Sequence, residues 1–407
     1  MSINFRKLLC KLVHKGGWLW RTADCQRYEP VVTDPTPPPL PEPPPPNPPG
    51  PTEPPPPPPQ PPPVEPTRPK TFVGTSVYQL LEFPLGQITW FLENLYKTGA
   101  NCTEIFASYT WSRGEGIQPA LKEGDLYRLS KPNPQYWNAL HHIMVECARL
   151  KITLFLRVFD YCSIKDETYY KRLCWHSCWE KKEWQDARKA WGGFYGDKPR
   201  EYYADFIDSI LAVASSTGCN VRFVAVNEAG YKPSRKEVMG WIKRELPEEN
   251  WQKELTPAEI ITVDAHSDKI ILDFHKWMRQ VLGNRLVAIS VNKKYKDNWS
   301  WAVGENIILE HHGCNSPETM KEIYVEYGFA HVVPNGDGPD PHALGRQGDE
   351  PTKREPSLAQ ARSMGAFIKR YNPAYYLFFN RNTERTLPAY LTRATFDIIT
   401  EMVKAAI

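Results

Sequence analysis

The sequence predicts an α/β protein, a (β/α)8 TIM barrel preceded by a proline-rich linker and a short N-terminal segment. Two observations lead to this fold class. From residue 70 onward, short apolar runs rich in β-branched residues alternate with longer segments of helical period, and eight such runs can be counted. Helix-length crossovers between buried strands indicate a parallel sheet, and eight strand-helix repeats within residues 70–407 indicate that this sheet closes.

The expected elements are spread over the whole of this region. Strands are expected at residues 71–77, 102–109, 153–160, 221–227, 285–291, 306–310, 330–333 and 374–380. Helices are expected at residues 86–97, 135–150, 201–215, 268–282, 316–327, 357–371 and 392–406. A doubly wound open sheet is the alternative fold. It would require a Gly-rich phosphate loop after an early strand, and neither G-x-G-x-x-G nor G-x-x-x-x-G-K is present.

Residues 31–69 form a proline-rich linker that cannot build a core, because 23 of the 40 prolines fall there. At about 3.1 Å per residue, a polyproline II rod of this length would span roughly 100 Å. The segment is interpreted as a stiff spacer. PxxP spacings occur in it many times, so a ligand for proline-reading modules such as SH3 domains is the alternative. Residues 70–407 show no second low-complexity break and suit one catalytic domain.

Residues 1–30 are predicted to be a short basic amphipathic anchor or a disordered tail, since apolar and basic residues alternate there at nearly helical spacing. The segment lacks the unbroken apolar core of a secretory signal, and no segment approaches the 18 apolar residues of a transmembrane helix. The large domain is nearly neutral within a formal net charge of +3, so nothing indicates a nucleic-acid partner.

Nine cysteines, an odd number scattered through apolar segments, indicate buried thiols rather than a disulfide framework. The exception is Cys174-Trp175-His176-Ser177-Cys178, with Cys162 upstream. It could be written as a zinc site, but this spacing is not a standard ligand pattern and no second pair follows it. A local disulfide or free thiols are the preferred interpretation. We expect no metal and no cofactor.

Polar, aromatic and acidic residues gather where the expected strands end. In parallel barrels the functional groups lie at the carboxyl ends of the strands. The fourth strand ends in Asn227-Glu228 and the sixth in Glu310, which suggests a pair of carboxylates, the working parts of glycoside hydrolysis. We expect Glu228 and Glu310 to be catalytic. Substrate-binding residues are expected to be Asn227, Arg157, Trp111, Asp160, Tyr231, His312, Asp337 and Asn380.

Asn227-Glu228 at the end of the fourth strand resembles the Asn-Glu of clan A glycoside hydrolases, and the resemblance is limited to residues 70–407. It implies a retaining (β/α)8-barrel enzyme in which Glu228 is the acid/base and a glutamate ending the seventh strand is the nucleophile. It also implies an arginine that supports the nucleophile, matched by Arg157, and a His lining the site, matched by His311 or His312.

The sequence departs from that family pattern in the position of the second carboxylate. Glu310 ends the sixth expected strand, whereas the seventh is followed by Asn335-Gly336-Asp337 and offers no glutamate. Either one strand is miscounted or the second carboxylate has moved, in which case Asp337 is the rival nucleophile. We favour Glu310. A separation of about 5 Å between the two carboxyl groups would indicate retention, and about 6.5 to 9.5 Å inversion.

Tryptophan and tyrosine concentrate in the connections after the strands, where they could stack on sugar rings. Residues 161–200 hold four tryptophans and are interpreted as a lid or binding wall, or as a small satellite core beneath a long loop. The predicted function is a glycoside hydrolase acting on a poly- or oligosaccharide. The alternatives are a catalytically inactive carbohydrate-binding barrel and a metal-dependent hydrolase, which would generally need an H-x-H that is absent.

The order of basic head, proline rod and barrel suggests a tethered enzyme that reaches a polymer. Residues 1–30 would anchor it to a protein or a surface. The hypothesis is an extracellular or virion-attached depolymerase with no recognisable signal peptide and no transmembrane segment.

Overall fold

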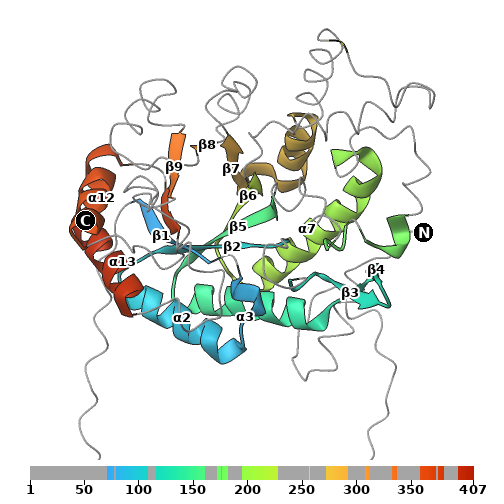
Figure 1. The fold of residues 1–407 in the computed structure, drawn as a ribbon, viewed down its shortest axis with the longest axis horizontal. Coiled ribbons are helices and arrows are strands. Elements are labelled where there is room, and N and C mark those ends of the chain that lie inside the picture. The colour runs from blue at the N-terminus through green and yellow to red at the C-terminus, as the bar shows by residue number, and fades with distance from the viewer. Residues whose placement is uncertain are drawn as a thin grey trace, which may run out of the picture. The chain divides into compact units, whose positions relative to one another are not determined.

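The computed structural model describes residues 71–77, 79–108, 116–160, 172–175, 177–181, 195–227, 256, 272–291, 308–311, 332–336, 358–372, 375–379 and 393–407. Eight parallel strands close into a barrel in the order β1-β10-β9-β8-β7-β6-β5-β2 (Figure 1). Their bounds are β1 (Phe72–Ser76), β2 (Cys102–Phe106), β5 (Thr153–Asp160), β6 (Val221–Asn227), β7 (Leu286–Val291), β8 (Ile308–His311), β9 (Val332–Gly336) and β10 (Tyr375–Phe379). The predicted (β/α)8 barrel is therefore confirmed.

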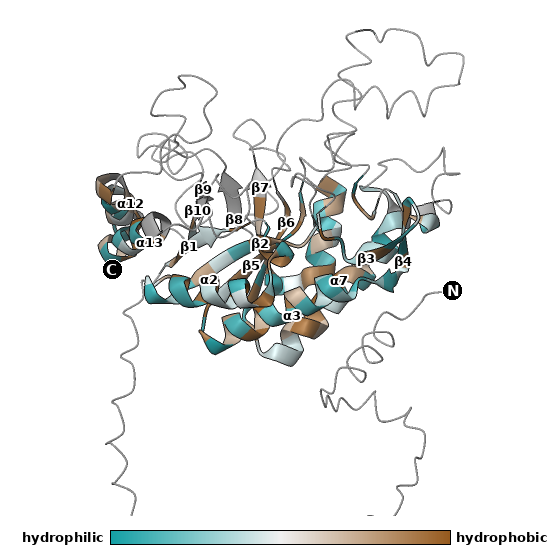
Figure 2. Ribbon diagram, turned by 60° about the horizontal axis from the view of Figure 1, so that its bottom comes forward, coloured by the Kyte–Doolittle hydropathy of each residue, from teal (hydrophilic) through white to brown (hydrophobic). Residues whose placement is uncertain are grey.

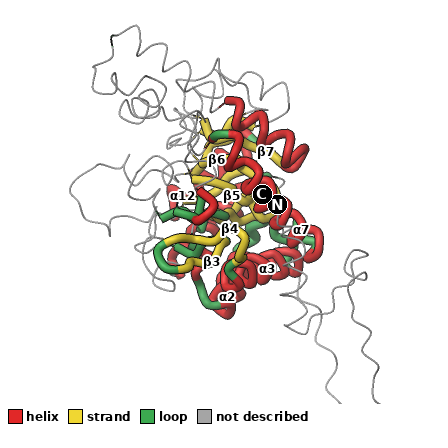
Figure 3. The backbone as a smooth tube through the Cα atoms, turned by 90° about the vertical axis from the view of Figure 1, so that its right-hand side faces the viewer, coloured by secondary structure: helices red, strands yellow, loops and turns green. Residues whose placement is uncertain are grey.

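Helices lie outside the strands, as Figure 3 shows for α2, α3 and α7. They are α2 (Leu85–Lys97), α3 (Pro134–Arg149), α7 (Asp197–Thr217), a helix over residues 272–282, α12 (Leu358–Tyr371) and α13 (Arg393–Ala406). Short 3-10 turns are η2 (Leu80–Glu82), η3 (Trp179–Lys181) and η6 (Gly283–Arg285). Each of these helices overlaps a predicted one. The predicted helix at residues 316–327 lies outside the described residues.

The sequence of α3 explains where it starts and which face it buries. Asn133 caps it by accepting a hydrogen bond from the backbone N–H of Gln135, and Pro134 occupies the first turn, where no backbone donor is needed. Most of its apolar residues recur every three or four positions and are buried, and hydrophobic and hydrophilic residues are mixed along its ribbon (Figure 2). The buried set includes Tyr136, Leu140, Ile143, Met144 and Cys147.

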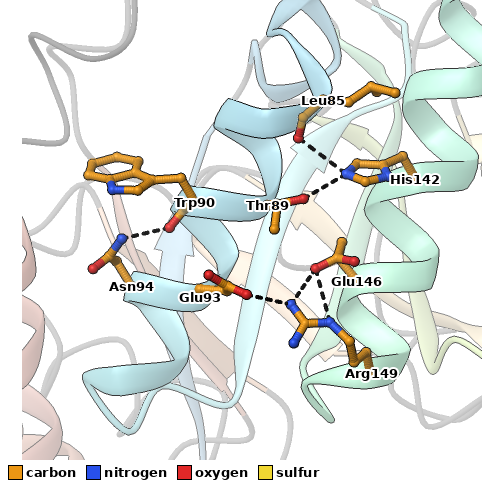
Figure 4. A network of polar contacts seen from close by, with 8 residues as sticks. All are labelled: Leu85, Thr89, Trp90, Glu93, Asn94, His142, Glu146 and Arg149. Atoms are coloured by element: carbon orange, nitrogen blue, oxygen red, sulfur yellow. Dashed lines mark hydrogen bonds and ion pairs between the residues drawn. The ribbon is translucent and has the colours of Figure 1, made fainter. Parts of the chain in front are cut away.

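Polar contacts join α2 to α3 on their exposed sides (Figure 4). Arg149 donates to Glu93 of α2 at 2.9 Å and to Glu146 of its own helix, and His142 Nε2 lies 2.8 Å from Thr89 Oγ1. Exposed ion pairs of this kind contribute about 0 to 1 kcal/mol each. Burial of the apolar faces therefore holds these helices on the barrel.

The barrel interior is filled by side chains from several strands. A buried cluster contains Cys102, Phe155, Val224, Ala288, Tyr375 and Leu377. The rings of Phe155 on β5 and Tyr375 on β10 lie 4.7 Å apart, and the Phe72 ring of β1 lies 5.7 Å from Phe155. Because β5 and β10 are not neighbours in the sheet, these rings meet across the interior.

Gly74 allows β1 to approach β2 closely. The two strands pair with Gly74 opposite Cys102, and a Cβ on Gly74 would lie 1.8 Å from the Cys102 carbonyl oxygen. No side chain can be accommodated at that distance. A glycine here is therefore required by the closure of the barrel rather than by a turn.

A two-stranded antiparallel hairpin, which was not predicted, follows β2. It consists of β3 (Ala120–Glu123) and β4 (Leu126–Pro132), with Gly124 in the turn at φ 63°. The hairpin is bound to the segment after β5: the Tyr127 N–H donates to the Ser177 carbonyl at 2.7 Å, and the Glu180 carboxylate accepts from two backbone N–H groups of β4. The described parts of the connections after the second and third barrel strands are thus hydrogen-bonded to each other.

All described residues belong to one compact unit. The proline-rich linker at 31–69 and the N-terminal segment at 1–30 lie outside them and stay predictions. Within the described ranges, no helix combines the length and apolar character required to cross a bilayer.

Candidate active site

Two of the predicted site residues, Asp160 and Asn227, are paired at the ends of neighbouring barrel strands. The last residue of β5, Asp160, pairs in register with the last residue of β6, Asn227. Asp160 is buried, with 4% of its surface exposed. Glu228 follows Asn227 directly in the chain. The predicted sugar-binding pair Asp160 and Asn227 therefore sits at the carboxyl end of two adjacent strands, where barrel enzymes place their functional groups.

The number of barrel strands decides whether Glu310 lies on the sixth or the seventh strand. With eight strands in the closed barrel and β1 taken as the first, β8 is the sixth and β9 the seventh. Glu310 therefore lies on the sixth strand, and the possibility that an unrecognised strand would move it to the seventh is removed. In register, Glu310 pairs with Ser290, and Ile308 pairs with Ala288 of the interior cluster. Strand positions two residues apart belong to the same face of a sheet. The Glu310 position is therefore on the same face of β8 as that of Ile308, which pairs with an interior residue.

Arg157 is fully buried inside the barrel with a carboxylate partner. Its Nε lies 2.6 Å from Glu104 Oε1, and the two side chains are 0% and 1% exposed. The hydroxyl of Ser76 on β1 donates to the other oxygen of Glu104. The Arg157 guanidinium carbon also lies 5.7 Å from the centre of the Phe106 ring. Three adjacent strands, β1, β2 and β5, therefore hold one buried ionic group.

In the strand register, the ionic group of Ser76, Glu104 and Arg157 lies next to the apolar cluster, on the side of the strands' carboxyl ends. Ser76, Glu104 and Arg157 each lie two residues beyond the strand positions of Gly74, Cys102 and Phe155, on the same alternation. Burial, together with the nearby Glu104 carboxylate, raises the pKa of the Cys102 thiol well above its usual value. The interior changes from apolar to charged on passing toward the carboxyl ends of the strands.

Trp175 belongs to a buried aromatic cluster behind the strand ends. It is 5% exposed, and its indole N–H donates to Ser108 Oγ at 2.9 Å. Its ring lies 5.2 Å from that of Tyr203 and 5.0 Å from that of Phe206, both on α7. For this tryptophan of residues 161–200 the satellite-core interpretation holds. Trp179, in contrast, is 37% exposed and lies 4.8 Å from the Arg128 guanidinium.

The cysteines that the structure describes are free thiols, as predicted: Cys102, Cys147, Cys174, Cys178 and Cys219 are buried and unbridged. Cys174 and Cys178 thus form no disulfide with each other. Within the described ranges, no three His, Cys, Asp or Glu side chains are grouped so that they could hold a metal ion.

Six predicted site residues lie outside the described residues: Trp111, Glu228, Tyr231, His312, Asp337 and Asn380. The structure describes the preceding residue for four of them. Asn227 ends β6, His311 ends β8, Gly336 ends β9 and Phe379 ends β10. Roles for the six residues stay predictions.

Sequence reasoning did not identify Glu104 or Ser76 as part of this region. A signal for Glu104 was present, since it is a charged residue at the centre of the short strand Cys102–Phe106. All five residues of that strand are buried, so an acid there requires a partner.

These features define the protein as a closed (β/α)8 barrel with a charged interior layer near the strand ends. Solved glycoside hydrolase structures share this fold at low sequence identity. The β-N-acetylhexosaminidase from Bacteroides fragilis NCTC 9343 aligns with a TM-score of 0.50 and 8% identity, covering 82% of this chain and 66% of that chain. The endo-1,4-β-D-mannanase from Thermotoga petrophila RKU-1 aligns at 0.49 and 12%, covering 82% and 99%.

A third similar structure, the β-1,4-mannanase from the sea hare Aplysia kurodai, aligns with a TM-score of 0.47 and 10% identity, covering 83% and 92% of the two chains. No family model matches the sequence. A search of curated proteins also finds no match. At these identities the likeness establishes the fold alone. The β-N-acetylhexosaminidase therefore shows that a solved glycoside hydrolase has this fold.

Proposed function

We propose that this protein is a glycoside hydrolase that cleaves a poly- or oligosaccharide with Glu228 and Glu310. The observation that carries the proposal is the arrangement of the barrel strands that lead to the two acids. Glu228 follows the last residue of β6. Glu310 lies on β8, at a strand position on the same face as interior positions. Only β7 lies between β6 and β8 in the barrel, so the strands that lead to the two acids belong to the same side of the barrel.

The chemistry follows from their surroundings. Glu228 is proposed to protonate the leaving oxygen, a role that requires a carboxyl whose pKa is raised, as desolvation and a nearby like charge do in general. Glu310 has to stay ionised in order to attack the anomeric carbon. Arg157 supplies positive charge inside the barrel, and Asn227 is suited to hydrogen-bond a sugar hydroxyl that carries changing charge in the transition state.

The test uses Glu228→Gln, Glu310→Gln and Asp337→Asn on a panel of polysaccharides and aryl glycosides that includes β-linked mannans, glucans and N-acetylhexosaminides. Both Gln variants should lose turnover by at least about 10³-fold, since each removes a group required in the transition state. Glu93→Gln on α2, whose carboxylate is exposed, is the matched control and should keep full activity. Unchanged turnover in a Gln variant removes that residue from the mechanism. Loss in Asp337→Asn but not in Glu310→Gln makes Asp337 the nucleophile.

Binding without turnover on the whole panel would favour the catalytically inactive carbohydrate-binding barrel. Such a protein needs sugar-contacting groups but not the carboxylate pair.

We also propose that residues 1–69 tether the domain to a protein or a surface, as in an extracellular or virion-attached depolymerase. The proposal is supported by the composition of residues 31–69, which favours a stiff rod. A chain beginning at Lys70 should keep turnover on soluble oligosaccharides and lose attachment. Loss of turnover on removal of the first 69 residues would contradict this modular organisation.

A further inference from the structure

Two cysteines of neighbouring strand–helix units lie against each other at the end of the barrel where the strands begin. Cys147 is in the last turn of α3, and Cys219 follows Gly218, the residue that ends α7 in the left-handed conformation. Both cysteines are buried, with 0% and 8% of their surface exposed. Their two thiols are hydrogen-bonded to each other.

Backbone hydrogen bonds attach the surroundings of both cysteines to the first residues of β5. The Cys147 carbonyl accepts from the Ile152 N–H at 2.9 Å. The carbonyl of Asn220, the residue after Cys219, accepts from the Leu154 N–H, also at 2.9 Å. One short piece of strand therefore holds the two cysteine backbones near each other, and thiols that already share a hydrogen bond are within the side-chain reach that a disulfide requires.

We infer that Cys147 and Cys219 form an oxidation site whose thiols close to a disulfide when the chain folds in contact with a small disulfide oxidant such as oxidised glutathione. The two cysteines are 72 positions apart in the sequence, and the loop that the bond closes contains β5, the connection that follows it and α7. Cross-links that close long loops restrict the unfolded chain most and thereby stabilise the folded one. Such a bond forms whether or not the protein is a glycosidase.

The reaction is a thiol–disulfide exchange. The thiolate of Cys219, the more exposed of the two, attacks one sulfur of oxidised glutathione, releases one glutathione thiolate and leaves a mixed disulfide. The Cys147 thiolate then attacks the Cys219 sulfur and releases the second glutathione thiolate. The two cysteine thiols lose two electrons and two protons, and oxidised glutathione is reduced to two thiols.

The folded chain protects the thiols from this reaction once they are covered. The hydrogen bond with Cys219, together with burial, raises the pKa of the Cys147 thiol well above its usual value, so that thiolate, the attacking species, is scarce there. We therefore expect the bond to form while the chain folds, before α3 and α7 cover the pair.

The experiment refolds the reduced full-length chain from urea at about pH 8 in a glutathione buffer set to about −200 mV, the poise of an oxidising compartment. Free thiols are blocked with N-ethylmaleimide, and the chain is digested with trypsin without reduction. Each cysteine then lies in a peptide with no other cysteine, residues 129–149 and 201–222, because Pro132 prevents cleavage after Lys131. We expect mass spectrometry to find these two peptides linked in most chains, with the mass of the pair less two hydrogens.

Stability supplies a second readout. For a loop of this length and an unfolding entropy summed over residues 70–407, the oxidised protein should unfold up to about 6 °C above the reduced protein. This difference should vanish in Cys147→Ala and in Cys219→Ala. Comparing the two redox forms of one variant removes the cost of the truncation itself. Cys178→Ala is the matched control, since it removes a buried thiol whose Sγ lies 3.8 Å from the Trp175 carbonyl oxygen, and it should keep both the linked peptides and the Tm difference.

The peptides and the unfolding temperatures decide the outcome together. Unlinked thiols in the refolded protein, a mixed disulfide that persists on Cys219, or a link from either peptide to a different cysteine would overturn the inference. A linked pair with no increase in Tm would remove the stabilising role. If little protein refolds, the folded reduced chain is kept in the same buffer with protein disulfide isomerase until the linked fraction is constant, and the same two peptides decide.

Discussion

Replacing Gly74 by alanine should separate β1 from β2 and weaken the whole barrel. The added Cβ would lie 1.8 Å from the carbonyl oxygen of Cys102 and 2.9 Å from its Sγ. A carbon and an oxygen require more than about 3 Å, so the backbone of one strand has to move by more than about 1 Å. Interiors packed as densely as crystals resist such shifts, and overpacking typically costs about 1 to 3 kcal/mol, occasionally more.

We expect a loss at the upper end of that range, about 3 kcal/mol, because the obstructing atom is backbone rather than the end of a flexible side chain. With an unfolding entropy of about 2.1 cal/mol/K per residue over residues 70–407, this corresponds to a decrease in Tm of about 4 °C. Differential scanning calorimetry measures it. The same shift would move Ser76 on β1 away from Glu104.

The matched control is Gly86→Ala on α2, where a new Cβ would meet no atom within 4 Å. Alanine is favoured over glycine in a helix by up to about 1 kcal/mol, so this variant should be neutral or slightly more stable. Equal Tm values for the Gly74 and Gly86 variants would refute the close approach of β1 and β2.

Three further predictions concern the packing around the barrel. Gly365→Ala on α12 should decrease Tm by several degrees, because its Cβ would lie 2.2 Å from the Met402 carbonyl oxygen of α13; an unchanged calorimetric scan would contradict this close helix contact. Ser108→Ala should cost about 1 to 3 kcal/mol in urea unfolding, since it leaves the buried Trp175 N–H without its acceptor; in a double-mutant cycle with Trp175→Phe the two losses should be less than additive if the hydrogen bond is the cause, and additive losses would contradict it. His275 is buried and its pKa is lowered by desolvation to about 3, below the usual 6.5. The unfolded chain therefore binds a proton between these values, and stability should fall as pH decreases from about 6.5 toward 3, by about 2 kcal/mol at pH 5; His275→Gln should lose this slope, and an identical slope would show that another group is responsible.

Much of the fold could be predicted because the barrel repeats one pattern. Buried strands are short apolar runs, and the helices between them present apolar residues every three or four positions, as in α3. Both signals are local, so the eight strands and most helices could be identified within a few residues. The hairpin β3–β4 was missed because its strands are short and half exposed, and its turn at Gly124 carries the only strong signal.

The charged interior could not be predicted in the same way. Glu104 and Arg157 are 53 positions apart, and neither has a local partner that would identify it. A single acid in Cys102–Phe106 also fits a strand with one solvent-facing side, and only the closed barrel shows that both faces are covered. Trp175 illustrates a related limit, since composition alone cannot distinguish a tryptophan that stacks on sugar from one packed against α7.

The proposed pair of Glu310 as nucleophile and Glu228 as acid/base can be tested by trapping the covalent intermediate. An activated 2-deoxy-2-fluoro glycoside of the best substrate sugar is reacted with the full chain, and the labelled peptide is identified by mass spectrometry. We predict that one glycosyl group per chain, on Glu310, accumulates in the wild-type protein. A label on Asp337, or turnover with inversion at the anomeric carbon and no label at all, would contradict it.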